Sequence, residues 1–206
     1  EGAGADLTTG EHNVAMGYQA LYRGTTESDD NVAIGYQAMY GNFTTNAVND
    51  CVVIGSGAGA GTLTSDASGS TLIGTAAGAA LTSGIGNVAI GYQALDAEDD
   101  GDNNTAVGYQ ALTAQTGTSG EVANTAVGYQ SGLAITKGRD NTILGFKAFI
   151  TEDVGDKSTA IGGKSLYSQN SDSDNENANN VGLGFGSGYH NVTGQNNTFL
   201  GTNAGY

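Results

Sequence analysis

A nine-residue stretch with glycine at its fifth position recurs eleven times and constrains the fold more than any other feature. Its clearest copy, residues 31–39, reads Asn-Val-Ala-Ile-Gly-Tyr-Gln-Ala-Met. Successive central glycines lie 17 to 22 residues apart, and a period of this length indicates a repeat architecture. We call them the pivot glycines: Gly17, Gly35, Gly55, Gly74, Gly91, Gly108, Gly128, Gly145, Gly162, Gly184 and Gly201.

The residues before each pivot glycine alternate in a way that is typical of a β-strand. Every copy has Val or Thr three places before the glycine, and an aliphatic residue or Met one place before it. Because alternate residues of a strand share a face, we expect these side chains to fill the interior. The small residue between them, such as Ala33, would then face outward. The pivot glycine would be a corner that leads into a second strand, for example residues 36–39.

One such repeat cannot bury its apolar face alone, but stacked repeats can. We therefore predict an all-β fold, a parallel β-solenoid of eleven repeats that occupies residues 1–206 as a single array. At about 4.8 Å per coil the rod would be roughly 50 Å long. A helical repeat is disfavoured because the period is two and the cores are rich in Gly, Val and Thr. The cores are residues 13–21, 31–39, 51–59, 70–78, 87–95, 104–112, 124–132, 141–149, 158–166, 180–188 and 197–205.

The motif Asn-(Val/Thr)-Ala-(Ile/Val)-Gly, with Ala or Ser three residues after the glycine, resembles the head repeats of trimeric autotransporter adhesins. Its longer form, Asn-Thr-Ala-Val-Gly-Tyr-Gln-Ala-Leu at residues 104–112, is similar to repeats of phage tail fibres. The resemblance covers all eleven cores. It implies a left-handed parallel β-roll, commonly a homotrimer, that serves as a rigid stalk or adhesive head. The corresponding location is extracellular, on a cell surface or a virion.

The composition narrows the range of partners. The formal net charge is −15, from 21 acidic and 6 basic residues. This charge disfavours binding to nucleic acid and to anionic membrane surfaces. No apolar run approaches the roughly 20 residues of a membrane span, so membrane insertion is not expected. The single cysteine, Cys51, has no partner for an intrachain disulfide, and we interpret it as a structural thiol.

Two columns of repeated side chains are expected along the rod. Asparagine opens most cores, and stacked asparagines can form hydrogen bonds along the axis. An aromatic residue follows most pivot glycines, and stacked coils would align these rings. The rings would either pack on one another or at a subunit interface, or they would bind sugar or another partner. The ladder residues include Asn13, Asn31, Asn87, Asn104, Asn124, Tyr18, Tyr36, Tyr92, Tyr109 and Tyr129.

The acidic residues all lie in the connectors between cores, which predicts that they are solvated, because burial of a carboxylate is costly. The side chains of Asp96, Glu98 and Asp100 partly match the start of a calcium loop, but Val107 stands where the bidentate Glu is required. A second acidic connector runs from Asp172 to Glu176. We expect neither cofactor nor metal, with calcium at the first connector as the weak alternative.

No catalytic constellation is apparent, so we predict a protein that is not an enzyme. The first hypothesis is a structural fibre segment that carries adhesive loops for a cell-surface glycan or receptor, and that self-associates as a trimer. The alternative is a subunit of an extracellular filament, joined head to tail through solenoid ends that lack polar caps. Ice binding by a threonine array is disfavoured because the threonines would face the core.

Overall fold

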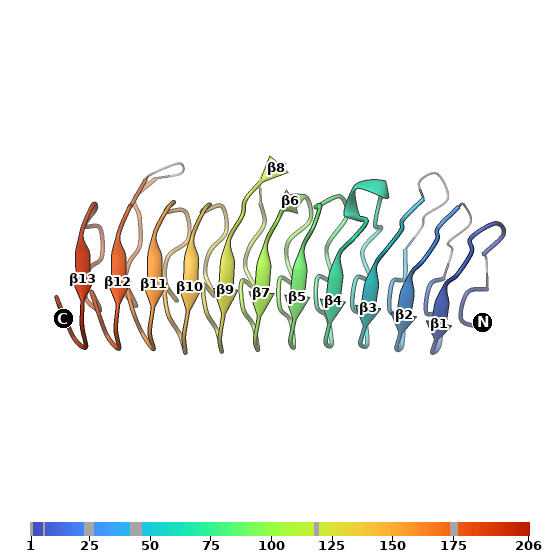
Figure 1. Cartoon of the computed structure of the whole chain (residues 1–206), viewed down its shortest axis with the longest axis horizontal. Helices are drawn as coiled ribbons and strands as arrows, with labels where there is room; N and C mark the ends of the chain where they lie inside the picture. The colour runs from blue at the N-terminus through green and yellow to red at the C-terminus, as the bar shows by residue number, and fades with distance from the viewer. Residues whose placement is uncertain (1, 6, 23–26, 42–46, 118–119, 174–176) are drawn as a thin grey trace.

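The computed structural model is a straight rod made of stacked coils. It describes residues 2–5, 7–22, 27–41, 47–117, 120–173 and 177–206. One strand from each coil joins a single parallel sheet of eleven strands, which lie side by side from the N-terminal to the C-terminal end (Figure 1). The predicted all-β parallel β-solenoid is therefore confirmed. Among the described residues, no helix is long and apolar enough to cross a bilayer.

Each strand of the large sheet is three residues long and ends just before its pivot glycine. The strands are β1 (Val14–Met16), β2 (Val32–Ile34), β3 (Val52–Ile54), β4 (Thr71–Ile73), β5 (Val88–Ile90), β7 (Thr105–Val107), β9 (Thr125–Val127), β10 (Thr142–Leu144), β11 (Thr159–Ile161), β12 (Val181–Leu183) and β13 (Thr198–Leu200). Equivalent residues pair directly, as Thr105 does with Thr125. The connectors carry the short strands β6 (Gly101–Asp102) and β8 (Gly120–Glu121), which pair with each other, and the 3-10 turn η1 (Ser65–Ala67).

The pivot glycines form a column, and two physical constraints require glycine there. Their φ angles run from +118° to +141°, a region that L side chains rarely adopt. The coils also approach closely at this point: a Cβ on Gly91 would lie 2.3 Å from the carbonyl oxygen of Gly108. The same approach allows the Gly108 N–H to donate to the Ile90 carbonyl at 2.8 Å. The regular repeat of glycine follows from this stacking.

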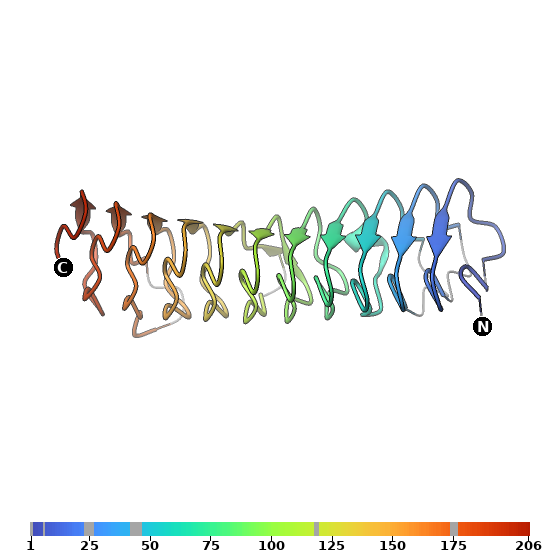
Figure 2. The same ribbon diagram turned by 90° about the horizontal axis from the view of Figure 1, so that it is seen from below.

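The prediction of which strand face is the core was wrong. The middle residue of the strand points inward, and Ala33, Ala89 and Ala106 are fully buried. The flanking residues, which were expected to fill the interior, point to solvent, and Leu144 and Leu183 are 47% and 43% exposed. Figure 2 shows the strands along one side of the rod, with the rest of each coil folded behind them. In these coils the interior has little room beside the strand, so it accepts the small residue.

The second predicted strand was also wrong, because the residues after each pivot glycine form a turn. In the second coil, both Gln37 and Met39 have left-handed φ angles, of 51° and 53°. These alternating left-handed residues reverse the chain and bring the fourth residue after the glycine into the interior. Large side chains at this position, which are all fully buried, supply much of the core: Leu21, Met39, Leu95, Leu112, Phe149 and Leu166.

The interior keeps its packing by exchanging volume between two positions. In the third and fourth coils the middle strand residues are large, Val53 and Leu72, and both are buried. The fourth residue after the pivot is then glycine, Gly59 or Gly78. A Cβ on Gly78 would lie 2.7 Å from Leu72 Cδ2, so the large strand residue occupies the space that Leu or Met fills elsewhere. This exchange explains why these two repeats depart from the common sequence.

The asparagines that open the cores bond along the rod axis, to backbone groups of the following coil. Asn87 Oδ1 accepts the backbone N–H of Asn104 at 2.9 Å, and its Nδ2 donates to the carbonyl of Gly101 at 2.8 Å. The side-chain oxygens that accept in this way belong to Asn13, Asn31, Asn87, Asn104, Asn124, Asn141 and Asn180. Just before each strand begins, the asparagine side chain thus supplies the hydrogen bond between coils that backbone groups supply within the strands.

Candidate interaction surface

The outward residues of the strands form a continuous apolar stripe along the rod. We define the apolar stripe as the first and third residues of the eleven strands of the large sheet. Its most exposed apolar members are Val14, Met16, Ile90, Leu144, Val181, Leu183 and Leu200. The threonines of the stripe, including Thr125 and Thr142, also face solvent. The reason given above for disfavouring ice binding, threonines that face the core, was therefore wrong.

The size of the apolar stripe exceeds what isolated surface residues produce. Two columns about 7 Å apart along eleven coils of about 4.8 Å give a face of roughly 10 by 50 Å, about 500 Å². Contiguous apolar patches above a few hundred Å² typically mark sites of interaction with another molecule. None of the six basic and 21 acidic residues lies in a stripe position. The stripe is therefore the main candidate for an interface.

An aromatic ladder borders the apolar stripe, at the position just after the pivot glycine. Tyr18 and Tyr36 stack with ring centroids 5.5 Å apart. The rings of Tyr92, Tyr109 and Tyr129 stack at 5.1 and 5.3 Å, and Phe146 continues the stack. The tyrosines of the ladder are between 42% and 54% exposed, so neighbouring rings cover their faces while their edges meet solvent.

An amide ladder runs beside the aromatic ladder, at the second position after the pivot glycine. Gln37 Nε2 donates to Gln19 Oε1 at 3.0 Å. Gln110 Nε2 donates to Gln93 Oε1 at 3.1 Å, and Gln130 Nε2 donates to Gln110 Oε1 at 2.9 Å. Where two glutamines occupy adjacent coils, the side-chain amide of the later one thus donates to that of the earlier one, and Gln110 is bonded in both directions along the rod. The sequence analysis did not identify this ladder, although the Tyr-Gln dipeptide of the repeat signals it.

A second aromatic column, which the sequence analysis also missed, occupies the fifth position after the pivot glycine. Tyr22 stacks on Tyr40 at 5.5 Å near the N-terminal end. Tyr167 stacks on Tyr189 at 4.8 Å, and Tyr206 lies 5.1 Å from Tyr189 at a tilt. The constant offset from the pivot glycine was the available signal. Because the column contains few rings in the middle of the rod, it does not form a continuous surface.

Two glutamates contradict the prediction that the acidic residues are solvated. Glu98 and Glu152 are fully buried. Each begins a Glu-Asp-x-Gly-Asp segment, a repeated motif that the sequence analysis did not recognise. Glu152 Oε1 accepts the backbone N–H groups of its own turn, and its Oε2 accepts the hydroxyl of Ser171 at 3.0 Å. Glu98 Oε1 likewise accepts three N–H groups, ending with that of Gly101 at 2.8 Å. These donors offset the cost of burying the carboxylates.

The sites of Glu98 and Glu152 differ in the group that contacts the second carboxylate oxygen, Oε2. In the coil after Glu98, Gly117 stands at the position that Ser171 holds after Glu152. Glu98 Oε2 is buried and has no hydrogen-bond partner among the described residues. A Cβ on Gly101 would lie 2.8 Å from both this oxygen and Val122 Cγ2, which places the oxygen on the core side. Burial raises the pKa of the Glu98 carboxyl, against the lowering effect of the backbone donors.

Of the three residues predicted as weak calcium ligands, Glu98 and Asp100 lie close together and Asp96 does not. Carboxylate oxygens of Glu98, Asp99 and Asp100 lie within 4.8 Å of one another, whereas Asp96 accepts from Gln93 and is not in this group. Burial, followed by the Asp99 carboxylate, raises the pKa of Asp100. The bonds of Glu98 to its own turn provide a structural reason for the cluster. In the second acidic connector, positions 174 and 176 lie outside the described residues.

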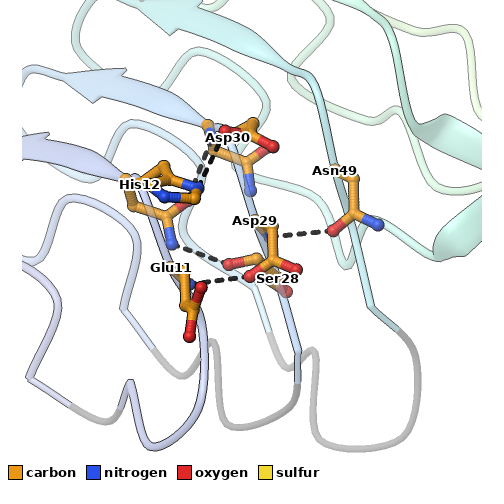
Figure 3. Close-up of polar contacts among 8 residues, drawn as sticks. Glu11, His12, Ser28, Asp29, Asp30 and Asn49 are labelled. Carbon is orange, nitrogen blue, oxygen red and sulfur yellow. Dashed lines mark hydrogen bonds and ion pairs between the residues drawn. The ribbon is translucent and has the colours of Figure 1, made fainter.

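Other connector carboxylates link neighbouring coils. Asp29 Oδ1 accepts the backbone N–H of Glu11 at 2.7 Å, and Asn49 Oδ1 accepts that of Asp29 at 2.8 Å (Figure 3). His12 Nδ1 lies 3.3 Å from Asp30 Oδ1 at the exposed edge of the same coils. Such bonds hold the connectors in register, so many of the acidic side chains have a structural role.

Cys51 occupies the core position that asparagine holds in most coils. The side chain is buried, and its Sγ lies 3.4 Å from the carbonyl oxygens of Asn49 and Ala67. Burial raises the pKa of the Cys51 thiol, which keeps it protonated. A buried protonated thiol of this kind is a poor nucleophile.

Comparison with known proteins gives no match: no family model, no curated protein and no solved structure is similar to the chain.

Proposed function

We propose that this protein is a non-enzymatic fibre segment that associates side by side with copies of itself and presents adhesive surfaces for a cell-surface receptor or glycan. The observation that carries the proposal is the apolar stripe, which runs along all eleven coils of the single chain, with its residues half-buried in some coils and exposed in others. Its area of about 500 Å² per chain is below the roughly 800 Å² per partner of a standard interface. Two chains that each bury this area give a total of about 1,000 Å², the size of a weak or transient interface.

The resemblance to adhesin heads and tail fibres supports three copies, a left-handed roll, and a location outside the cell or on a virion. The structural basis for association along the side of the rod is independent of that resemblance, because it follows from the exposed Ile, Leu, Met and Val side chains. The connectors, which bear the acidic residues, remain on the other faces of each rod. They would stay available for a receptor.

Molecular mass in solution tests this proposal. Sedimentation and light scattering of the wild-type chain should give a discrete oligomer, with a trimer expected. The double variant Ile90→Glu/Leu144→Glu places two charges in the stripe and should reduce the mass to that of one chain. Ala80→Glu, at an exposed connector position, is the matched control and should leave the oligomer unchanged.

The outcomes separate the alternatives. Long fibres in electron microscopy, unaffected by the stripe variant, would favour the head-to-tail filament. A wild-type monomer at high concentration would rule out self-association, and thermal hysteresis in that monomer would revive ice binding by the outward threonines.

A further inference from the structure

The longest interruption of the aromatic ladder spans two coils, and it coincides with an interruption of the amide ladder. In the third and fourth coils, Ser56 and Thr75 take the places of the aromatic residues, and both are exposed. Gly57 and Ala76 take the places of the glutamines. The ladders therefore stop at Tyr36 and Gln37 and resume at Tyr92 and Gln93. We call the surface between them the ladder gap.

The ladder gap leaves two aromatic faces without a ring neighbour. Tyr18 covers one face of Tyr36, and Tyr109 covers one face of Tyr92. The opposite faces of Tyr36 and Tyr92 point into the gap. Three coil steps of about 4.8 Å separate these two tyrosines, roughly 14 Å. This distance corresponds to two missing rings, so two flat rings would fit between the tyrosines.

The amide groups at the borders of the ladder gap lack their usual ladder partners. The Oε1 atoms of Gln19, Gln93 and Gln110 each accept from the glutamine of the next coil, but no described residue donates to Gln37 Oε1. Gln93 Nε2 has no glutamine to donate to in the preceding coil and makes a long bond of 3.3 Å to Asp96 Oδ2 instead. One border therefore offers an acceptor, and the other offers a donor that a ligand could recruit.

The floor of the ladder gap is low and hydroxylated. Apart from its two chain neighbours, no described residue has an atom within 4 Å of the point where a Cβ on Gly57 would be, so this point is open. The hydroxyls of Ser56 and Thr75 can each donate and accept a hydrogen bond. The aromatic position is also vacant at Gly163, but there the ring of Phe185 comes within 3.2 Å of the point where a Cβ on Gly163 would be and occupies that space.

We infer that the ladder gap binds carbohydrate, as one or two pyranose rings stacked between Tyr36 and Tyr92. A pyranose has an apolar C–H face that packs on an aromatic ring, and hydroxyls at its edge that both donate and accept. The gap supplies both kinds of partner: two aromatic faces, an amide acceptor, an amide donor and two hydroxyls. This inference rests on the proposed adhesive role and names the ligand class for it.

The most direct test of sugar binding is a variant in which tyrosines fill the ladder gap. Ser56→Tyr/Thr75→Tyr completes the ladder with the residue that the repeat carries in five other coils, so the fold should be retained. The matched control is Thr202→Tyr, at the same repeat position in the last coil. Tyr36→Ala/Gln37→Ala removes one border instead of filling the gap. Circular dichroism and solution mass confirm that each variant folds and assembles as the wild type does.

Saturation-transfer NMR with methyl glycosides of glucose, galactose, mannose and N-acetylglucosamine, together with a printed oligosaccharide array, gives the readout. We expect the wild type and Thr202→Tyr to bind at least one pyranoside, and both gap variants to lose at least ten-fold in affinity. Absence of saturation transfer and array binding in the wild type, or equal binding by the filled variant, would overturn the inference. If that occurs while the wild-type rod still adheres to cells, the adhesive role survives; loss of both removes it.

Discussion

The assignment of the two strand faces can be tested with neighbouring residues of strand β10. Ile143 is fully buried and Leu144 is 47% exposed, although both have four-carbon aliphatic side chains. Ile143 Cδ1 lies 2.9 Å from the point where a Cβ on Gly132 would be, so it fills the space that this glycine leaves. Ile143→Ala should therefore leave a cavity and cost about 3 kcal/mol, within the usual range of about 2–5 kcal/mol.

Leu144→Ala should cost far less in a single chain. About half of the side chain is already in water, burial of a whole leucine contributes about 1.5–3 kcal/mol, and truncation at the surface leaves no cavity. A loss of about 1 kcal/mol or less follows. For a chain of this length, 1 kcal/mol corresponds to about 2–4 °C in Tm. We expect a drop of about 6–12 °C for Ile143→Ala and at most about 4 °C for Leu144→Ala.

The assay is thermal unfolding followed by far-ultraviolet circular dichroism, at protein concentrations where sedimentation shows single chains. Stacked repeats can unfold in parts, so hydrogen exchange of the β10 amides provides a local check. At higher concentration, Leu144→Ala should become the more harmful change, because it weakens the apolar stripe. Equal losses in single chains, or a larger loss for Leu144→Ala, would refute the inward orientation of the middle strand residue.

Further substitutions, and the addition or removal of calcium, each predict a distinct effect on stability. Gly108→Ala puts a Cβ 2.3 Å from the Gly128 carbonyl oxygen at a φ of +141°, and should lower stability by at least about 2–3 kcal/mol in urea unfolding. Asn104→Ala removes the buried acceptor for the next coil and should cost about 1–3 kcal/mol in the same assay; no change would show that water replaces the side chain. The raised pKa of Glu98 means that the folded chain holds this proton more tightly than the unfolded chain does. Its stability contribution is present below the ordinary glutamate pKa and is lost as pH rises through the raised value. Glu98→Gln should flatten this slope in Tm against pH, whereas Glu152→Gln should lower Tm at neutral pH because it perturbs the six hydrogen bonds that this carboxylate accepts from its own turn and from Ser171. Calcium and chelator should give the same Tm, and a shift of many degrees with calcium would assign a metal to the acidic connectors.

The orientation of the strand could not be obtained from the period of two alone. Alternation shows that Val107 and Ala106 face opposite sides, but not which side is inside. The larger side chain was assigned to the core because burial of apolar area is favourable. In this coil the interior beside the strand is already occupied by Leu112 and its equivalents, which the turn directs inward. Only the small residue fits, so local packing decides against the general preference.

The burial of Glu98 and Glu152 also could not be predicted from the sequence. The sequence places Glu98 and Glu152 in polar connectors, where solvation is the ordinary expectation. Burial becomes possible because the turn that follows each glutamate directs successive backbone N–H groups at one carboxylate oxygen. Further contacts depend on the neighbouring coil, which supplies Ser171 to Glu152 and only Gly117 to Glu98. The contacts within the turn can be inferred from the repeated Glu-Asp-x-Gly-Asp motif, whereas the contacts with the neighbouring coil depend on how the coils stack.

The amino-acid sequence by itself determined that the chain is a stacked solenoid. A glycine at every pivot, with a β-branched residue at a fixed offset, is compatible with coils that repeat the same backbone path in register. The tertiary structure decided what each coil presents to solvent. The direction of a side chain depends on the turn after the pivot glycine and on the volume left by the coils above and below. Those two factors put the large strand residues outside.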